Sequence, residues 1–421
     1  MRGEQAVVEA IRPPEGVNRL FAAGHDADYS THLATFGTMV PSSLGPNFVD
    51  ELARSGLSGR GGAGFPVARK FGAAASRQAD RLWARSPVVI ANGAEGEPRS
   101  IKDSTLLRHA PHLVIDGLLA AGAAVGASKL YLYVPAGSIG FLRAAVRERK
   151  DARSIVLVEA KETFISGEAS AVVNAIENGI AVPTDRIVRL TTSGLRRLPT
   201  LVHNVETLAQ VGLIARFGAG WFRSLGSERD PGTRLVTVSG FVAQERVMEV
   251  AGHTSIADIL VSCGIALEGV SAVLVGGYHG AWIAREHLSA SLSAGGLAPH
   301  GARPGAGILY VLGRHECPLV AAASIVHYLA NESARQCGPC LFGLPEMASL
   351  LERLATGDRE RGLRRQVEAL TESVIGRGSC HHPDGTAGLV LSTLAVFAGD
   401  VDAHLAGRCQ RIATPVRGSN G

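Results

Sequence analysis

A glycine-rich loop at residues 59–64, followed by Lys70, is the first segment whose residue types could do chemistry. The loop reads Gly-Arg-Gly-Gly-Ala-Gly and matches the pattern G-x-G-x-x-G. Bare backbone N–H groups in such a loop can close on a phosphate, and the Lys70 ammonium adds a positive charge. The loop follows an expected helix instead of a strand, so it is a weak dinucleotide signature, and a flexible surface turn is the alternative.

A second polar group follows the apolar, β-branched segment Val88–Asn92, which is typical of a buried parallel strand. Loops at the carboxyl ends of parallel strands are where open α/β sheets bind ligands. The amide of Asn92 and the carboxylates of Glu95 and Glu97 could there face a heterocycle that has both donors and acceptors. A solvated acidic turn is an equally good interpretation of this segment taken alone.

Residues 166–168 and 204–207 stand at the starts of two further expected helices. Both are good helix-capping sequences, and capping is their simplest interpretation.

The cysteines form a third candidate site. Cys337 and Cys340 have C-x-x-C spacing, and Cys380 is followed by His381 and His382. Thiolates and imidazoles in this pattern are typical of zinc or an iron–sulfur cluster. Disulfides are not expected in a reducing cytosol, and plain burial is the alternative. The remaining cysteines, expected to be packing residues, are Cys263, Cys317 and Cys409.

Alternating strands and helices must position these residues. Strands are expected at Val88–Asn92, 130–134 and 155–158, and helices at Asn47–Ser55, 104–127, 138–150 and 168–177. This alternation predicts a doubly wound α/β layer up to about residue 230. Beyond it, a hairpin of 235–239 with 247–250, a helix at 255–263 and a strand at 272–275 predict a small α+β module. A Gly/Ala/Pro/Ser linker at 291–307 leads to an apolar segment at 308–312, and four helical segments between 317 and 405 predict a helical bundle. The expected domains are therefore 1–230, 231–300 and 310–410.

The composition of the chain argues against several classes of protein. The 421 residues include 46% hydrophobic and 19% charged residues, which excludes a disordered chain. The net charge is only +4, and no stretch combines Arg with aromatic residues, so no nucleic-acid partner is expected. The closest approach to a membrane span, residues 113–127, contains Asp116 and is expected to be a buried helix. The N-terminal residues 1–16 are charged where a signal peptide is apolar, which predicts a cytoplasmic protein.

Taken in order, these motifs resemble the flavin-bearing, NADH-oxidising subunit of respiratory complex I and the related diaphorase subunits of hydrogenases and formate dehydrogenases. Residues 56–70 resemble the glycine loop of that family, and 92–103 its N-A-D-E-x-E-P segment. Residues 164–171 resemble its Y-I-C-G-E-E-T-A segment, and 199–208 its P-T-T-V-N-N-V-E-T-L segment. Residues 332–343 resemble its cluster-binding segment. The resemblance spans residues ~35–405.

The resemblance implies an α/β fold: an FMN-binding Rossmann-like domain, a ubiquitin-like (β-grasp, SLBB-type) module and a C-terminal four-helix iron–sulfur bundle. It implies hydride transfer from NAD(P)H to FMN, followed by one-electron transfer through a 4Fe–4S or 3Fe–4S cluster. A ferredoxin-like or other iron–sulfur protein is the implied partner. A membrane-bound reductase or complex is another implied partner, and it could hold the chain at the inner face of the membrane.

The implied FMN-binding residues are Gly59, Arg60, Gly61, Gly62, Lys70, Asn92, Glu95, Phe164, Gly167, Glu168, Val202, Asn204 and Thr207. Glu95 and Glu97 are the expected catalytic residues, and Phe65 is the expected nucleotide-binding residue. The implied cluster ligands are Cys337, Cys340 and Cys380.

Several positions depart from the family pattern at the nucleotide side of the site. The second Glu of the E-E pair is Ala169, so a carboxylate that would repel a 2′-phosphate is missing. Family aromatic positions align with Ala73 and Arg189, and each lost stacking partner costs about 1 kcal/mol. The Asp of N-A-D-E is Ala94. These changes leave two alternatives to NAD(P)H oxidation: a nucleotide-independent electron relay and a cofactor-poor binding scaffold.

The cluster segment departs as well, because the first family cysteine is Ala334. Three thiolates allow a 3Fe–4S cluster, or a 4Fe–4S cluster whose fourth iron takes His381, His382, water or a partner group.

Overall fold

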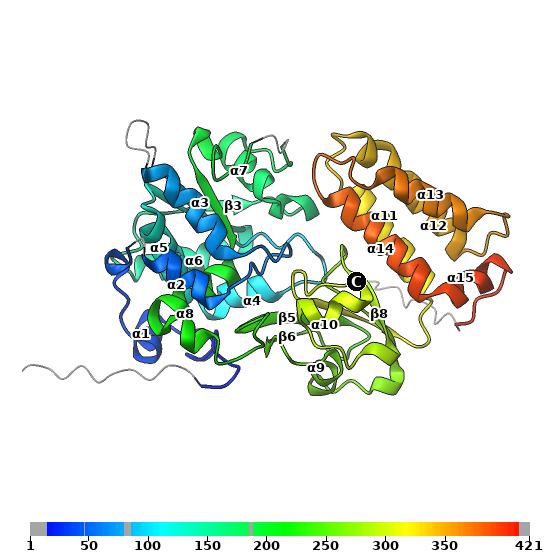
Figure 1. Ribbon diagram of the computed structural model, residues 1–421, viewed down its shortest axis with the longest axis horizontal. Helices are drawn as coiled ribbons and strands as arrows, with labels where there is room; N and C mark the ends of the chain where they lie inside the picture. The colour runs from blue at the N-terminus through cyan, green and yellow to red at the C-terminus, as the bar shows by residue number, and fades with distance from the viewer. Residues whose placement is uncertain (1–14, 46, 80–85, 185–187, 412–421) are drawn as a thin grey trace, which may run out of the picture.

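The computed structural model describes residues 15–45, 47–79, 86–184 and 188–411. The expectation for the N-terminus falls mostly on residues 1–14, outside these ranges. Residues 185–187, which precede the family aromatic position at Arg189, also lie outside the described ranges. Figure 1 shows three parts: an α/β part that runs from α1 (Tyr29–Phe36) to α8 (Val205–Phe222), a second sheet below it, and a helical C-terminal part.

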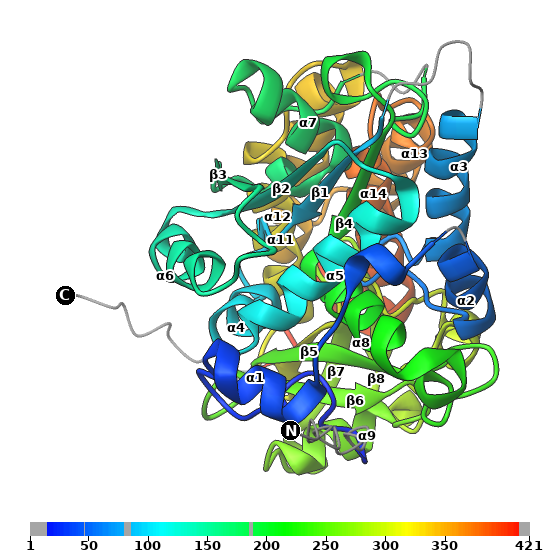
Figure 2. The ribbon, with the colours of Figure 1, turned by 90° about the vertical axis from the view of Figure 1, so that its left-hand side faces the viewer.

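A four-stranded parallel sheet with the order β3-β2-β1-β4 forms the centre of the first part (Figure 2). Its strands are β1 Val88–Asn92, β2 Lys129–Pro135, β3 Ile155–Ala160 and β4 Thr200–Asn204. Every residue of β1 is buried, because helices cover both faces of a parallel sheet. Asn92 lies opposite Asn204 in the register, so the carboxyl ends of β1 and β4 are adjacent. The three strands predicted from the sequence are confirmed.

Helices surround this sheet. They are α1 Tyr29–Phe36, α2 Asn47–Ser55, α3 Val67–Ala79, α4 Lys102–His109, α5 Pro111–Val125, α6 Ala136–Arg147, α7 Ala169–Asn178 and α8 Val205–Phe222. The single helix predicted over 104–127 is wrong: α4 ends at His109, because Pro111 cannot continue its hydrogen bonding and starts α5 instead. A Cβ on Gly117 would lie 1.7 Å from the Leu208 carbonyl oxygen, so α5 and α8 pack with their backbones in close contact.

The second sheet has the strand order β6-β5-β9-β7-β8. Its elements are β5 Thr233–Gly240, β6 Arg246–Ala251, α9 Ile256–Ser262, β7 Val270–Val275, β8 Ala281–Ala284 and β9 Ile308–Gly313. The predicted hairpin, helix and strand are confirmed, whereas β8 was not predicted. The linker interpretation of 291–307 is wrong: this segment includes α10 Ala294–Leu297, and it is folded onto the module because Leu292 and Leu297 are fully buried. β9 then lies in the middle of the sheet, beyond the expected boundary at 300.

The C-terminal part consists of α11 Pro318–Asn331, a π-turn at Pro339–Gly343, α12 Leu344–Ala355, α13 Leu363–Val374, α14 His382–Val396 and α15 Ala398–Leu405. The described residues thus contain one α-helix more than the four expected segments, because the chain bends by 82° between α14 and α15. This part packs on the second sheet, where the Trp282 backbone N–H donates to the Ser392 hydroxyl at 2.8 Å. Of the helices described, none alone is long and apolar enough to cross a bilayer; the bent pair α14–α15 passes that test by length and composition.

Candidate active site

The glycine loop connects α2 to α3 and packs on one side only. The Gly59 N–H donates to the Phe65 carbonyl at 2.9 Å and closes the loop. Gly62 and Gly64 have φ values of +109° and +60°, which favour glycine, and a Cβ on either would meet nothing within 4 Å. A Cβ on Gly61 would lie 2.9 Å from the Cβ of Asn204. The loop is therefore pressed against the start of α8 and open on its other side.

Arg60 anchors this loop and does not extend from it. Its backbone N–H donates to the Thr207 hydroxyl at 2.9 Å. Its buried guanidinium donates to the carbonyls of Pro231 and Thr233 at 3.3 and 3.0 Å and lies 3.6 Å from Asp230. Burial lowers the pKa of Arg60 to about 10. The Arg60 side chain thus ties the loop to the segment that enters the second sheet.

The two predicted catalytic carboxylates have different surroundings. Glu95 accepts from the N–H groups of Asp103 and Ser104 at 3.0 and 3.1 Å, so it caps the first turn of α4. Glu97 accepts from the N–H of Tyr278, in the turn between β7 and β8 of the second sheet, at 2.5 Å. Burial raises the pKa of Glu97 to about 8. Both carboxylates therefore hold the loop after β1 in place, one against α4 and the other against the second sheet.

Asn92 and the start of α7 lie side by side at the carboxyl edge of the sheet. The Asn92 amide donates to the Gly167 carbonyl at 2.9 Å. Glu168 accepts from the Ser170 N–H at 2.7 Å, which confirms its predicted capping role. The ammonium of Lys70 lies near Glu168; burial lowers the Lys70 pKa, and the carboxylate opposes this effect. These residues meet although three different helices and strands carry them.

Asn204 is held by a buried charge cluster that sequence reasoning missed. Its side chain caps α8 by accepting from the Glu206 N–H, and it donates to Asp103 at 2.6 Å. Lys102 lies 2.6 Å from Asp103 and 2.9 Å from Glu206, and all three side chains are buried. Burial raises the pKa of Asp103 to about 6 although Lys102 opposes it. The sequence carried one signal of this cluster: Lys102, one of only five lysines in the chain, is directly followed by Asp103.

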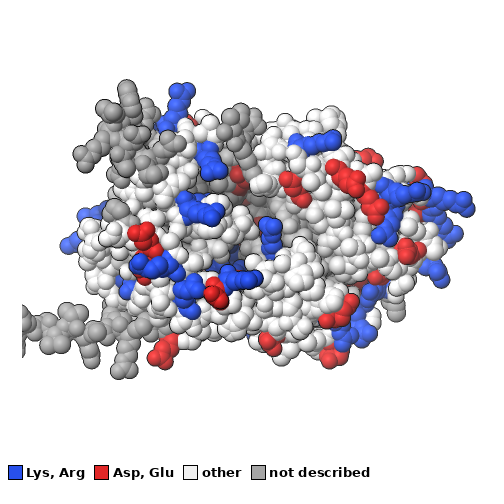
Figure 3. Space-filling model, in the orientation of Figure 1, with Lys and Arg blue, Asp and Glu red and all other residues white. Residues whose placement is uncertain are grey.

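The arrangement at this edge fits a flavin phosphate and polar ring. The loop offers an open backbone face, Lys70 supplies a cation, and α7 and α8 both begin here with their positive dipole ends. His203, buried beside Phe71 on the α3 side of β4, has an Nε2 without a hydrogen-bond partner among the described residues. The face in Figure 3 is hollowed near its centre, and Lys and Arg side chains border the hollow.

Three of the predicted flavin-binding and nucleotide-binding residues, Phe65, Phe164 and Val202, each lie in different surroundings. Phe65 is 44% exposed, and the Lys70 ammonium lies 5.9 Å from the centre of its ring. The Phe164 ring packs at 4.8 Å from His279. Val202 is buried in the hydrophobic cluster under α7. Contacts of Phe65, Phe164 and Val202 with a cofactor stay predictions.

The three predicted cluster cysteines gather around the π-turn that precedes α12. Hydrogen bonds with Ser379 and Cys340 outweigh burial and lower the pKa of Cys337. Burial, with the neighbouring Cys337 and Cys380, raises the pKa of Cys340 to about 12. Such buried, closely spaced thiols suit metal ions, which bind the deprotonated form and offset its burial.

The two adjacent histidines differ in their availability to a cluster. His382 Nδ1 lies 3.1 Å from His279 Nε2, and His382 Nε2 lies 2.8 Å from the Leu329 carbonyl. Both ring nitrogens of His382 are therefore engaged, which argues against it as the fourth ligand. The His381 side chain is 79% exposed.

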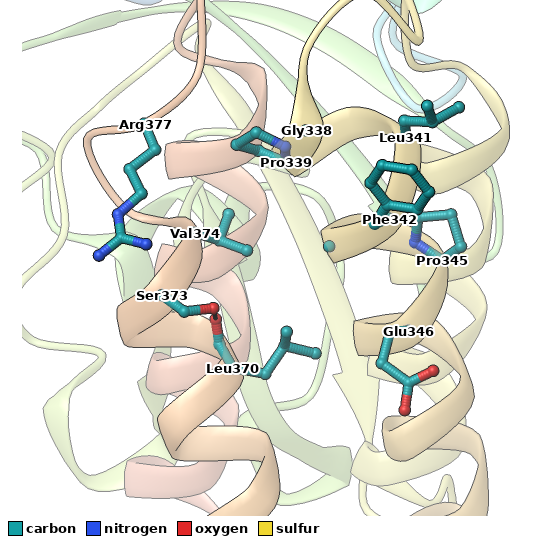
Figure 4. Close-up of a pocket in the computed structure, with 11 residues that line it drawn as sticks. Gly338, Pro339, Leu341, Phe342, Pro345, Glu346, Leu370, Ser373, Val374 and Arg377 are labelled. Atoms are coloured by element: carbon teal, nitrogen blue, oxygen red, sulfur yellow. Dashed lines mark hydrogen bonds between the residues drawn. The ribbon is translucent and has the colours of Figure 1, made fainter.

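A cavity of about 800 Å³ opens beside the cysteine segment (Figure 4). Figure 4 shows Leu341 and Phe342 on one wall and Leu370 and Val374 of α13 on the other. Phe342 is 70% exposed. The surface next to Cys340 is therefore apolar and open to solvent.

Comparisons with known proteins agree with this geometry. A family model described as the Nuo51 FMN-binding domain matches residues 52–213. A second, the NADH-ubiquinone oxidoreductase-F iron-sulfur binding region, matches residues 320–404. The F subunit of the NADH-quinone oxidoreductase of Mycobacterium tuberculosis is 30% identical over 392 residues, which cover 88% of this chain and 86% of the relative.

Two further comparisons extend to hydrogenases. The NADP-reducing hydrogenase subunit HndC of Solidesulfovibrio fructosivorans is 27% identical, with 89% of this chain and 78% of the relative covered. A chain of an NAD⁺-reducing [NiFe]-hydrogenase in the H₂-reduced state superposes with a TM-score of 0.78 at 29% identity, over 87% of this chain and 64% of that chain. The resemblance seen in the sequence is thereby confirmed, and the chain belongs to the family of the NADH-quinone oxidoreductase F subunits, whose models describe an FMN-binding domain and an iron–sulfur binding region.

Proposed function

We propose that this chain is an NAD(P)H dehydrogenase-type oxidoreductase that passes electrons from the nucleotide through FMN to an iron–sulfur cluster. One observation carries the proposal: the FMN-binding region and the cysteine segment share one chain and meet at a junction. There the Phe164 N–H, which follows β3, donates to Glu332 after α11 at 2.9 Å. Bound FMN would supply hydride acceptance from the nucleotide and one-electron release to the cluster.

The flavin phosphate would be held by the amides of Gly61 and Gly62 together with Lys70, whereas the Gly59 amide, which donates to the Phe65 carbonyl, would fix the shape of the loop. The open face of the loop and the half-buried ammonium support this role. Asn92, Gly167 and Glu168 would face the polar atoms of the ring and ribityl chain. Asn204 and Thr207 act by positioning, because Thr207 holds the Arg60 backbone and Asn204 supports Gly61.

Glu95 and Glu97, the expected catalytic pair, would act mainly on the shape of the site. Glu95 fixes the start of α4, and Glu97 joins the loop to Tyr278 of the second sheet. At neutral pH the raised pKa keeps Glu97 mostly protonated, so it adds little negative charge beside an anionic nucleotide. The exposed ring of Phe65 would stack on the adenine.

Cys337, Cys340 and Cys380 would hold the cluster, a 4Fe–4S or 3Fe–4S centre. The exposed His381, water or a partner group would complete a four-iron cluster. Exposed Leu341 and Phe342 beside Cys340 mark the face where an iron–sulfur partner would take the electrons. Such a partner complex would also hold this chain, in the cytoplasm, at the inner face of the membrane.

The proposed domains follow these roles. Residues 1–230 form the Rossmann-like FMN domain. The second is the ubiquitin-like, SLBB-type module, which we extend from 231–300 to residue 313 because β9 lies inside its sheet. The third, 314–410 instead of 310–410, is the iron–sulfur domain, with α11–α14 as its four-helix bundle and α15 crossing the end.

A nucleotide-independent electron relay is the second candidate. Ala169 and Ala73 remove a carboxylate and an aromatic ring from the nucleotide side, and exposed Arg189 replaces another ring. The loss of the carboxylate at 169 also predicts that any nucleotide preference is shifted toward NADPH.

Visible spectra of the anaerobically purified protein, before and after addition of NADH or NADPH, separate the two candidates. Flavin bands that bleach with either nucleotide support the dehydrogenase. Bands that bleach only with dithionite support the relay. Lys70→Ala should yield protein largely free of FMN, whereas Lys129→Ala, at an exposed lysine of β2, should retain it. Full flavin occupancy in Lys70→Ala contradicts the assignment of the phosphate site.

A further inference from the structure

Three potential metal ligands gather at the end of the helical domain, away from the candidate active site. Cys317 precedes α11, His404 lies in the last turn of α15, and Cys409 follows that helix. The two sulfurs and the His404 Nε2 all lie within 4.8 Å of one another. The Cys317 Sγ is 3.4 Å from His404 Nε2, although the two residues are 87 positions apart. Cys317 packs against the helical core, as expected, whereas Cys409 is exposed and is not a packing residue.

The imidazole of His404 is oriented as a ligand. Its Nδ1 lies 3.2 Å from the Leu354 carbonyl oxygen. A carbonyl can only accept, so Nδ1 carries the proton and Nε2 keeps a free lone pair that faces the sulfur of Cys317. Metal-binding histidines are held by this kind of contact at the second ring nitrogen. His404 is 3% exposed, so its ring lies almost wholly inside the protein.

Opposing effects act on the protonation of the Cys317 sulfur. Backbone N–H groups of Leu319 and Val320 in the first turn of α11 hydrogen-bond to its sulfur. The N-terminus of a helix favours negative charge. Burial and the neighbouring Cys409 sulfur act in the opposite direction and raise the pKa of Cys317 to about 11. A bound cation would remove this conflict, because it pairs with both sulfurs at once.

The segment that carries Cys409 is itself held in place. Gly407 has a φ of +73° and turns the chain back after α15. Beyond Cys409, Arg411 donates to Asp400 at 3.2 Å and to the Arg314 carbonyl at 3.0 Å. Arg314 precedes Cys317 by three residues, so these bonds bring the two cysteine-bearing segments together.

This cluster is separate from the cysteines of the iron–sulfur site. The iron–sulfur family match covers residues 320–404 and leaves Cys317 and Cys409 outside it. Cys317 and Cys337 stand before and after α11, whose 14 residues span about 20 Å. Figure 1 shows α15 at the end of the helical part that faces away from the first sheet.

We propose that Cys317, His404 and Cys409 bind a single Zn²⁺ ion. Two thiolates and one neutral imidazole are typical zinc ligands, and water would fill the fourth position on the side where Cys409 is exposed. Binding replaces the two S–H bonds by Zn–S bonds and releases two protons, with no change in oxidation state. The ion ties the segment after α15 to the start of α11.

Zinc and iron contents of the full-length protein, purified with a non-chelating reductant and supplied with Zn²⁺, test the proposal. We expect one zinc per chain in the wild type and in the matched control Cys263→Ser. Cys317→Ser and Cys409→Ser should lose at least nine-tenths of this zinc and keep their iron and FMN. Because Cys409 is exposed, Cys409→Ser is expected to fold even if Cys317→Ser does not.

Three results would overturn the proposal. The first is a wild type that takes up no zinc. The second is zinc that persists in Cys409→Ser and is lost in Cys340→Ser, since the ion would then occupy the iron–sulfur site. The third is a Cys317–Cys409 disulfide in the reduced preparation, detected as a 317–409 cross-linked peptide by mass spectrometry. Replacement of zinc by Co²⁺ adds a direct readout, because thiolate-to-cobalt absorption must disappear in Cys409→Ser.

Discussion

Glu97→Gln tests whether a carboxyl group is buried in its protonated form between the FMN domain and the second sheet. The side chain accepts a hydrogen bond from the Tyr278 N–H, and the amide oxygen of Gln can accept the same bond. A Cβ on Gly277 would lie 2.3 Å from a Glu97 oxygen, so the carboxyl is closely packed. The substitution therefore removes the titration of this group and keeps its shape.

The size and sign of the effect follow from the pKa. Burial raises the Glu97 pKa from 4.5 to about 8, so between these values the folded protein holds a proton that the unfolded chain has released. The stabilising contribution is greatest below pH 4.5 and is lost as the pH rises toward 8. Each pH unit in this window lowers the contribution of Glu97 to the free energy of unfolding by about 1.4 kcal/mol, which amounts to about 5 kcal/mol from pH 4.5 to pH 8. Gln carries no such penalty.

Urea unfolding at pH 5, 6, 7 and 8 measures this difference. We expect the free energy of unfolding of Glu97→Gln, relative to the wild type, to rise by about 3.5 kcal/mol between pH 5 and pH 8. Other titrating groups cancel in the comparison. Glu286→Gln, at an exposed glutamate, should show no such trend. A difference between Glu97→Gln and wild type that stays constant from pH 5 to 8 would refute the reasoning.

Three further substitutions, the first with a matched control, probe the other parts of the site. Gly61→Ala places a methyl group 2.9 Å from a side-chain carbon at the start of α8, and the FMN retained after gel filtration should fall several-fold. Gly72→Ala, at an open position in α3, should retain FMN and raise stability by about 1 kcal/mol. Glu206→Gln removes one of two carboxylates at the buried Lys102 and should lower the free energy of unfolding by about 3 kcal/mol, measured in urea. Ala334→Cys supplies a fourth thiolate and should raise the iron content or shift the EPR signal; no change in either would mean that a fourth ligand is already present.

Much of the candidate site could be predicted because its signals are local. The strand Val88–Asn92 and the capping residues Glu168 and Asn204 depend on the pattern of neighbouring residues, and all three are confirmed. Boundaries were less predictable. The break at Pro111 was missed because a long apolar run concealed it, and β8 was missed because it has only four residues.

The partners of individual side chains could not be predicted in this way. Arg60 lies in the glycine loop, yet its guanidinium binds carbonyls of Pro231 and Thr233. His382 was a candidate ligand until His279, from another part of the fold, was found at one of its nitrogens. In both cases the deciding contact joins residues more than 100 positions apart.

The sequence by itself determined most of the strands and helices, the glycine loop, and the family to which the chain belongs. These features depend on backbone preferences, hydrophobic periodicity and short motifs, which act over a few residues. Only the tertiary structure decided that Glu97 accepts a hydrogen bond from Tyr278 and that Cys317, His404 and Cys409 meet. The physical reason is that burial and ligand geometry arise from the packing of whole domains, and no local pattern encodes which distant groups that packing brings together.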